Sequence, residues 1–172
     1  MNTQATKNEK EYVLAPFRIL YDFREKAPYR FTGIQADACD NYLPMKIDAQ
    51  KAVLKTGDYT VEGLESRVAI ERKSLADLYG TLGQHRERFE REHQRLAAMD
   101  FAAVVVEADW YTILNAAPVF SSLSPKTVYR TILSWTMRFG VTWFLMGTRD
   151  LAEETTFRLL ERFWIGYSVK RN

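Results

Sequence analysis

The chain has 172 residues, of which 47% are hydrophobic and 13% aromatic, and its formal net charge is +2. This length suits one domain with its own core, and so small a charge excludes any argument for nucleic-acid binding from charge alone. Because Cys39 is the only cysteine, the sequence excludes an internal disulfide and a thiolate metal cage, and no apolar run reaches membrane-spanning length.

The first half of the chain is predicted to be mostly strands. Apolar runs bounded by turn residues indicate β-structure. They occupy Arg18–Phe23, Lys51–Leu54, Tyr59–Val61 and Arg67–Lys73. Segment 26–45 contains prolines, a glycine and several Asp and Asn residues, and we expect it to be irregular.

Helices and strands alternate in the second half. Ser74 suits a helix N-cap, with Asp77 at the third helical position, where an acid stabilises the helix N-terminus. Further helices are predicted over Gln84–Met99, Ser124–Phe139 with a stop at Gly140, and Leu151–Ile165, and strands over Phe101–Val106 and Val141–Met146. This alternation predicts an α/β sandwich.

The segment Thr56–Leu78 carries the clearest chemical pattern. Glu71 and Lys73 are two positions apart on a predicted strand, so the carboxylate and the ammonium project from the same face. Asp58 lies in the preceding turn and joins them if the two segments pair as a hairpin. Two carboxylates and a lysine around one point can hold a divalent metal and an activated water, which is how phosphodiester bonds are hydrolysed.

Each of these residues also has a structural interpretation. Asp58 can be an ordinary turn residue, and Glu71 with Lys73 an ordinary surface ion pair. However, Glu71 ends an apolar strand, where a part-buried carboxylate needs a cation. Arg72 points to the other face: its carbonyl can complete a metal shell, and its side chain can bind phosphate or form a structural ion pair. For Asp77 we favour a structural role in the Ser-x-x-Asp helix start.

Arginines crowd the predicted helix over 84–99. Three of them share one helical face: Arg88, Arg91 and Arg95. This face is either a solvated surface or a stripe that receives phosphates. The acids that would neutralise a solvated surface are Glu87, Glu90 and Glu92. His85 and His93 have no second histidine or cysteine at zinc spacing, so we expect both on the helix surface.

Four blocks of sequence between residues 18 and 108 follow one another in a characteristic order. They are Asp22-Phe23-Arg24-Glu25; Gly57-Asp58 with Glu71-Arg72-Lys73 and Asp77; Leu78–Leu82 followed by Arg86 or Arg88; and Val104–Glu107. The second block matches the pattern GD, a spacer, ERK, three residues and D. Together the four blocks resemble the XPF/Mus81-type structure-specific nucleases.

The resemblance implies a restriction-endonuclease-like fold, which is an α/β three-layer sandwich with a central mixed sheet flanked by helices. It also implies a Mg²⁺- or Mn²⁺-dependent DNA endonuclease that acts on branched DNA, such as a flap, a fork or a recombination junction. The catalytic residues would be Asp58, Glu71 and Lys73. The metal ligands would be Asp22, Glu25, Asp58 and Glu71. The residues that contact DNA phosphates would be Arg24, Arg72, Arg86 and Arg88.

Two acids, Glu25 and Glu107, each have two possible roles under this resemblance. Glu25 can pair with Arg24 or Lys26 on the surface instead of binding metal. Glu107 resembles the acid at the end of the family's strand, and it can either position the edge of the site or contact the metal.

DNA is the expected partner, together with a second copy of the chain bound through its C-terminal half. The predicted helix Ser124–Phe139 carries apolar residues over an arc wider than one sheet contact needs, and the last helix repeats the pattern. A large exposed apolar surface usually marks an interface, which favours a homodimer. The alternative is that both helices only cover the sheet.

We expect a flexible lead-in over residues 1–16 and a single nuclease domain over 17–172. The polar N-terminus lacks the core of a secretory signal, so the expected location is the cytoplasm of a bacterial cell or viral host, or the nucleus of a eukaryote. Family members usually add a C-terminal pair of helix-hairpin-helix modules, and none precedes Asn172. The sequence is therefore either truncated or a stand-alone nuclease, with a separate DNA-targeting partner as one solution. The rival functions are a non-catalytic DNA-binding subunit, and a nuclease of the same fold that cuts RNA or unbranched DNA.

Overall fold

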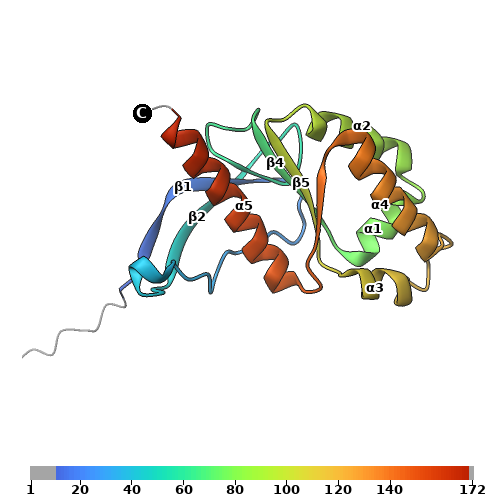
Figure 1. Cartoon of the computed structure of the whole chain (residues 1–172), viewed down its shortest axis with the longest axis horizontal. Coiled ribbons are helices and arrows are strands. Elements are labelled where there is room, and N and C mark those ends of the chain that lie inside the picture. Colours follow the sequence, from blue (N-terminus) through green and yellow to red (C-terminus); the bar gives the residue numbers. More distant parts are fainter. Residues whose placement is uncertain (1–10, 171–172) are drawn as a thin grey trace, which may run out of the picture.

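One mixed sheet of six strands organises the protein, whose computed structural model describes residues 11–170 (Figure 1). The strands are β1 (Val13–Asp22), β2 (Met45–Ala52), β3 (Tyr59–Val61), β4 (Val68–Lys73), β5 (Phe101–Val106) and β6 (Thr142–Leu145). The helices are η1 (Ala38–Asp40), α1 (Leu75–Leu82), α2 (Arg86–Ala97), α3 (Trp110–Asn115), α4 (Pro125–Phe139) and α5 (Arg149–Val169).

The strand order across the sheet is β2-β1-β3-β4-β5-β6. Strand β3 is antiparallel to both of its neighbours, β1 and β4, whereas β2 runs parallel to β1, and β4, β5 and β6 run parallel to one another. The β3–β4 pairing is the hairpin that the sequence pattern required. It brings the turn before β3 beside the end of β4.

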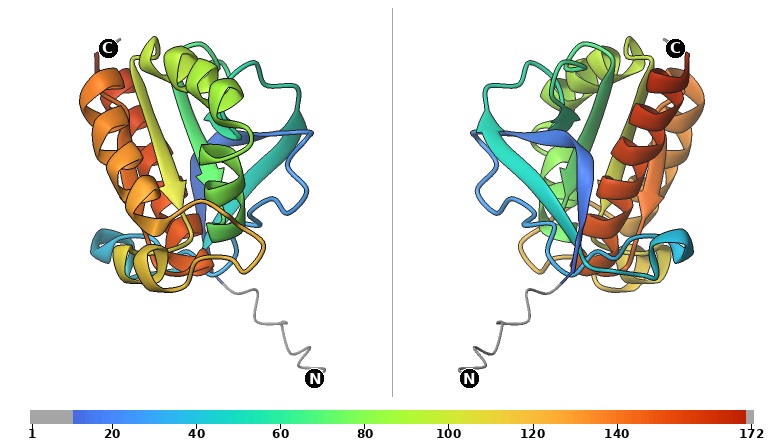
Figure 2. Two further views of the ribbon diagram at one scale, coloured as in Figure 1. Left: turned by 90° about the vertical axis from the view of Figure 1, so that its right-hand side faces the viewer. Right: turned by 90° about the vertical axis from the view of Figure 1, so that its left-hand side faces the viewer.

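The sheet buries a core on each face. Along β4, Val68 and Ile70 pack into one core with residues of α5, whereas Ala69 packs into the other with residues of α1, α2 and α4. In Figure 2, α1 and α2 face the viewer in the left-hand panel and α5 in the right-hand panel. Two helical layers around a mixed sheet confirm the predicted fold class.

Helix ends match the sequence signals closely. The Ser74 side chain accepts a hydrogen bond from the backbone N–H of Asp77, and Ser124 caps α4 through the N–H of Thr127. Gly140 ends α4 in the left-handed conformation, with φ of 69°. These caps place α1 directly after β4, at the edge of the sheet where the acids lie.

The structure differs from the sequence predictions at three elements. Strand β1 begins at Val13, so residues 13–16 belong to the sheet and not to a lead-in; residues 1–10 lie outside the described part. Strand β2 covers Met45–Ala52, so the irregular segment ends at 44 and the predicted strand Lys51–Leu54 is displaced. Helix α3 was not predicted, although Asp109 caps it by accepting from the N–H of Thr112 at 2.7 Å.

Within residues 11–170, no helix is long and apolar enough to cross a membrane.

Candidate active site

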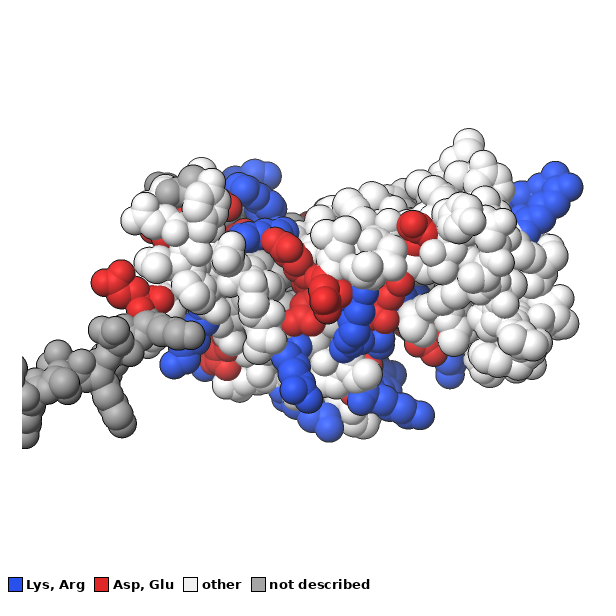
Figure 3. All heavy atoms as spheres, turned by 90° about the horizontal axis from the view of Figure 1, so that it is seen from below, with Lys and Arg blue, Asp and Glu red and all other residues white. Residues whose placement is uncertain are grey.

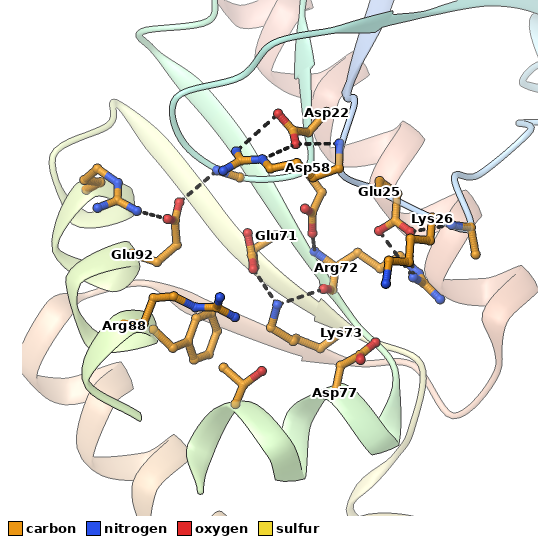
Figure 4. Close-up of a pocket in the computed structure, with 16 residues that line it drawn as sticks. Asp22, Glu25, Lys26, Asp58, Glu71, Arg72, Lys73, Asp77, Arg88 and Glu92 are labelled. Carbon is orange, nitrogen blue, oxygen red and sulfur yellow. Dashed lines mark hydrogen bonds and ion pairs between the residues drawn. The ribbon is translucent and has the colours of Figure 1, made fainter. Parts of the chain in front are cut away.

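A cavity of about 620 Å³ opens where β1 and β4 end, between the turn before β3 and helices α1 and α2 (Figure 4). Most residues predicted to carry chemistry line it. They are Asp22, Arg24, Glu25, Asp58, Glu71, Arg72, Lys73 and Arg88. The one predicted site residue outside this group is Arg86, so the fold brings together segments that are up to 66 positions apart in the chain.

Strand geometry places Glu71 and Lys73 side by side. Both share the sheet face of Ala69, which is the face covered by α1 and α2. The Lys73 Nζ donates to Glu71 Oε1 at 2.5 Å and to the Arg72 carbonyl at 3.3 Å, and it lies 4.7 Å from the ring centre of Phe89 on α2. Lys73 and Glu71 therefore form an ion pair in the wall of the cavity.

The turn before β3 delivers Asp58 to the same point. Its backbone N–H donates to the Ile70 carbonyl at 2.9 Å, and its carboxylate accepts from the N–H of Arg72 at 2.8 Å. Gly57 has φ of 70°, and a Cβ there would lie 3.0 Å from the Cβ of Ala69. This turn thus needs glycine for both conformation and space, and it holds Asp58 against β4.

The three charged groups influence one another strongly. Burial raises the pKa of Asp58 well above its ordinary value, and the charge of Glu71 adds to this rise. Burial also raises the pKa of Glu71, although Lys73 opposes it. Burial acts to lower the pKa of Lys73, but the two carboxylates outweigh it, so that its pKa is raised and the ammonium stays protonated at neutral pH. One lysine charge therefore faces two acids that are costly to ionise.

The donor atoms at this point suit a hard divalent cation. Carboxylate and carbonyl oxygens are the ligands that Mg²⁺ and Mn²⁺ prefer, and Asp58, Glu71 and the Arg72 carbonyl supply them. A divalent cation would also relieve the repulsion between the two acids. Within residues 11–170, however, no group of three or more Asp, Glu, His or Cys side chains is arranged to hold a metal ion. The predicted set of four acidic ligands is therefore not assembled in this structure.

Asp22, a predicted metal ligand, has both of its carboxylate oxygens engaged by hydrogen bonds within the protein. Its two oxygens accept from the N–H and side chain of Arg24 and from the N–H of Leu54, at 2.6–3.3 Å. Burial alone would raise the pKa of Asp22, but these hydrogen bonds lower it below its ordinary value. Asp22 thus ties β1 to the loop after β2 and anchors Arg24.

Glu25 and Arg72 belong to an ion-pair cluster on the opposite face of β4. The Arg72 guanidinium contacts Glu25 at 3.3 Å and Glu107 at 2.7 Å, and Arg149 at the start of α5 binds Glu107 at 2.9 Å. The side chains of Glu25 and Arg72 are only 9% and 10% exposed. This geometry favours an ion-pair role for Glu25, and for Arg72 it favours the structural ion pair over phosphate binding. Glu107 takes the positioning role.

The predicted phosphate-binding arginines divide between two places. Arg88 is exposed at the cavity, and none of its described neighbours engages it in a hydrogen bond or ion pair. Arg24 also lines the cavity, held by Asp22 with its side chain 63% exposed. Arg86 does not line the cavity: it donates to Thr131 Oγ1 on α4 at 3.0 Å and stacks over Trp135.

Sequence patterns missed two charged residues of the cavity wall, Glu92 on α2 and Lys26. Arg95, which the sequence placed on a possible phosphate-binding face, also lines the cavity. The face of α2 that turns to the cavity carries positions 88, 92 and 95, whereas Arg91 is exposed outside the cavity lining. The spacing of these positions was a usable signal, since they follow the helical repeat. Glu92, the acid among them, was interpreted as a surface residue that neutralises the neighbouring arginines.

His93 was also misplaced by the sequence analysis. It is fully buried between Phe89, Trp135 and Trp143, with neither ring nitrogen hydrogen-bonded. Its position four residues after the core residue Phe89 was the signal for burial.

Comparison with known proteins identifies the family. The sequence model of the ERCC4 domain matches residues 30–159, which is more than half of the chain. The chain belongs to the ERCC4 domain family. No curated protein matches it.

Two solved structures share the fold. One is of XPF from Aeropyrum pernix, with 17% identity and a TM-score of 0.56, over 84% of this chain and 58% of that chain. The other is of XPF from Aeropyrum pernix in complex with DNA, with 17% identity and a TM-score of 0.59, over 87% of this chain and 66% of that one. The ERCC4 chain thus spans less than two thirds of either relative. The predicted XPF-type nuclease domain and its fold are confirmed.

Proposed function

We propose that this ERCC4 domain is a metal-dependent endonuclease that hydrolyses phosphodiester bonds in DNA, with branched DNA as its substrate. One observation carries the proposal: Asp58, Glu71 and Lys73 meet in one open cavity, with the two acids facing a single ammonium. An arrangement that costs folding free energy in this way is typical of a site kept for chemistry. Branched substrates follow from the resemblance to XPF-type nucleases.

Asp58 and Glu71, with the Arg72 carbonyl, would hold Mg²⁺ or Mn²⁺. When bound, the metal supplies Lewis-acid activation of water and of the scissile phosphate. Lys73 is protonated because its pKa is raised, so it donates hydrogen bonds and does not act as a general base. Its ammonium can orient the attacking water and stabilise negative charge that develops on the phosphate oxygens.

Cations around the cavity would receive the flanking phosphates. Arg88 on α2, and Arg24 and Lys26 after β1, line the cavity. Figure 4 shows Arg88 and Lys26 on opposite sides of the acids. In Figure 3, acidic side chains gather near the middle of the lower face with Lys and Arg side chains around them. A DNA strand held by its phosphates on both sides of the acids would place one phosphodiester over them.

The proposed assembly is a homodimer through the C-terminal half. On α4, Val128, Ile132 and Trp135 are buried against the sheet, whereas Leu133 and Met137 on the adjoining face are 42% and 88% exposed. Figure 3 shows few charged side chains at the α3–α4 end of the molecule. An apolar surface with few charges suits a second copy of the chain.

Cleavage assays test the catalytic proposal. Flap, junction, linear duplex and single-stranded DNA, with an RNA strand for comparison, would be incubated with and without Mg²⁺. We expect cleavage of branched DNA that needs the metal and is abolished by Asp58→Asn, Glu71→Gln and Lys73→Ala, while Glu87→Gln on the exposed side of α2 cuts normally. Near wild-type cutting by Lys73→Ala would refute the mechanism. DNA binding without cleavage under any metal would favour the non-catalytic subunit, and preferential RNA cutting would favour an RNA nuclease.

A further inference from the structure

Glu92 is a carboxylate beside the metal-binding acids that comes from a different element. Helix α2 packs Phe89 and Leu96 into the core, and this leaves Glu92 facing the cavity with its side chain 17% exposed. Its negative charge contributes to the raised pKa of Glu71, after burial and against the effect of Lys73. A third carboxylate so near two others adds to their repulsion, so a favourable contact must offset this cost.

The contacts of Glu92 supply that reason. Its Oε1 accepts a hydrogen bond from the backbone N–H of Gly57 at 3.0 Å, across 35 positions of sequence, and its other oxygen pairs with Arg95 one turn along the helix. Gly57 is buried, so its N–H has no water to replace this partner. Figure 4 shows Glu92 reaching from α2 toward the turn that carries Asp58.

The same turn has few other supports on this side. Gly57 sits in the left-handed conformation, pressed against Ala69 and Ile70 of β4, while Asp58 is bonded to Ile70 and Arg72. The backbone carbonyl of Asp58 also accepts from the N–H of Asp22 on β1 at 2.9 Å. Strands β4 and β1 therefore hold the Asp58 end of the turn, whereas Glu92 holds the Gly57 end. Losing the bond from Glu92 would loosen the Gly57 end and let the Asp58 carboxylate shift against β4.

We propose that Glu92 is a positioning residue of the metal site, which holds the Gly57–Asp58 turn through the Gly57 N–H and so orients Asp58. The inference rests on the proposed metal-dependent function. Helix α2 would then have two roles: it presents Arg88 to the substrate, and it holds the metal-binding turn in place through Glu92. Partners that orient metal ligands typically affect metal affinity by about 10- to 100-fold.

Two substitutions separate the hydrogen bond from the charge. Glu92→Ala removes both, whereas Glu92→Gln removes the charge and keeps an oxygen that can accept from Gly57. Glu87→Gln, on the exposed side of the same helix, controls for the loss of one charge from α2. The first measurement is Mn²⁺ affinity by titration calorimetry on the full chain without DNA. The second is amide hydrogen exchange of residues 56–58 without metal, with the melting temperature of every variant checked.

We expect Glu92→Ala to weaken Mn²⁺ binding by about 10- to 100-fold and to speed exchange at the Gly57 amide. Glu92→Gln should bind Mn²⁺ clearly more tightly than Glu92→Ala and keep the Gly57 amide protected, and Glu87→Gln should match the wild type. Equal Mn²⁺ affinities for the Ala and Gln variants would overturn the inference, because the residue would then act through charge alone or not at all. If the wild type does not bind Mn²⁺, both the proposed function and this inference are refuted. If the wild type binds Mn²⁺ and Glu92→Ala binds it equally well, only this inference is refuted.

Discussion

At the scale of single residues, the ionisation of Asp58 is costly for the stability of the folded protein. Its pKa is raised by burial and by Glu71, so the folded state holds a proton on this carboxyl more tightly than the unfolded state does. Stability from this group is present at low pH and is lost as pH rises from the ordinary pKa through the raised one. At neutral pH an ionised Asp58 therefore destabilises the metal-free protein.

Asp58→Asn should accordingly stabilise the metal-free protein at pH 7 while abolishing cleavage. The amide oxygen can still accept from the N–H of Arg72, so the turn is kept. Thermal melts with and without Mn²⁺ check this: each kcal/mol gained raises the melting temperature by roughly 2–4 °C, and the stabilisation by metal seen in the wild type should disappear. If Asp58→Asn instead melts at a lower temperature than the wild type without metal, the ionised Asp58 does not destabilise the metal-free protein.

Asp77 lines the cavity, yet its contacts are those of a helix start. The Ser74 hydroxyl donates to its carboxylate at 2.6 Å while accepting from its backbone N–H. Asp77→Asn should lower stability by about 0.5–1 kcal/mol and leave most cleavage activity. Chemical denaturation and a cleavage time course measure the two effects. Lost activity at an unchanged denaturation midpoint would move Asp77 into the catalytic machinery.

At the scale of elements, helix α2 carries two arginines with different tasks. Arg88 is unpaired among the described residues and faces the cavity, whereas Arg86 bonds Thr131 and stacks on Trp135 of α4. Arg88→Ala should weaken DNA binding and reduce the slope of log affinity against log salt by about 1. Arg86→Ala should leave that slope unchanged and cost about 1–2 kcal/mol of stability. Salt-dependent DNA titrations and denaturation curves of both variants compare them directly, and reversed effects would refute the assignment.

The packing of α2 on α4 and β6 also makes stability depend on pH. Burial lowers the pKa of His93 to about 4, against 6.5 for a free histidine. The unfolded state therefore binds the proton first. The stability linked to this group is complete above about pH 6.5 and is lost as pH falls toward 4, by on the order of 3 kcal/mol.

His93→Phe should flatten this dependence between pH 7 and pH 4 relative to the wild type. Urea midpoints at several pH values measure it, and the exposed His85, changed to Gln, serves as the control that keeps the wild-type profile. An identical profile for His93→Phe would show that other groups cause the acid sensitivity.

At the scale of the whole molecule, the exposed apolar face of α4 predicts self-association. Sedimentation at micromolar concentration should give twice the 20.0 kDa of one chain. Met137→Glu should restore the monomer without lowering the melting temperature, because Met137 is 88% exposed in the single chain. Val53→Glu, at an exposed position after β2, is the matched control. A 20 kDa wild-type species would contradict the dimer, and a dimer that survives Met137→Glu would place the interface elsewhere.

Local signals in the sequence determined much of this protein. The alternation along β4 put Glu71 and Lys73 on one face because strand side chains repeat every two residues, and the caps at Ser74, Ser124 and Gly140 set helix ends through bonds within a few residues. The family also followed from the order of short motifs. Strand β2 and helix α3 carried similar signals, in the alternating Met45, Ile47 and Ala49 and in Asp109, but no strand over 45–50 and no helix after Asp109 was predicted.

Only the tertiary structure decided which charged residues meet. Asp22, Glu25 and Arg72 line the cavity as the sequence suggested, but the partners that engage Asp22 and Arg72, Leu54 and Glu107, come from distant segments that the sheet brings together. Glu92 and His93 are neighbours on one helix, yet one faces the cavity and the other the core. Which acid is free to bind a metal depends on which cations the fold places beside it, and no local pattern contains that information.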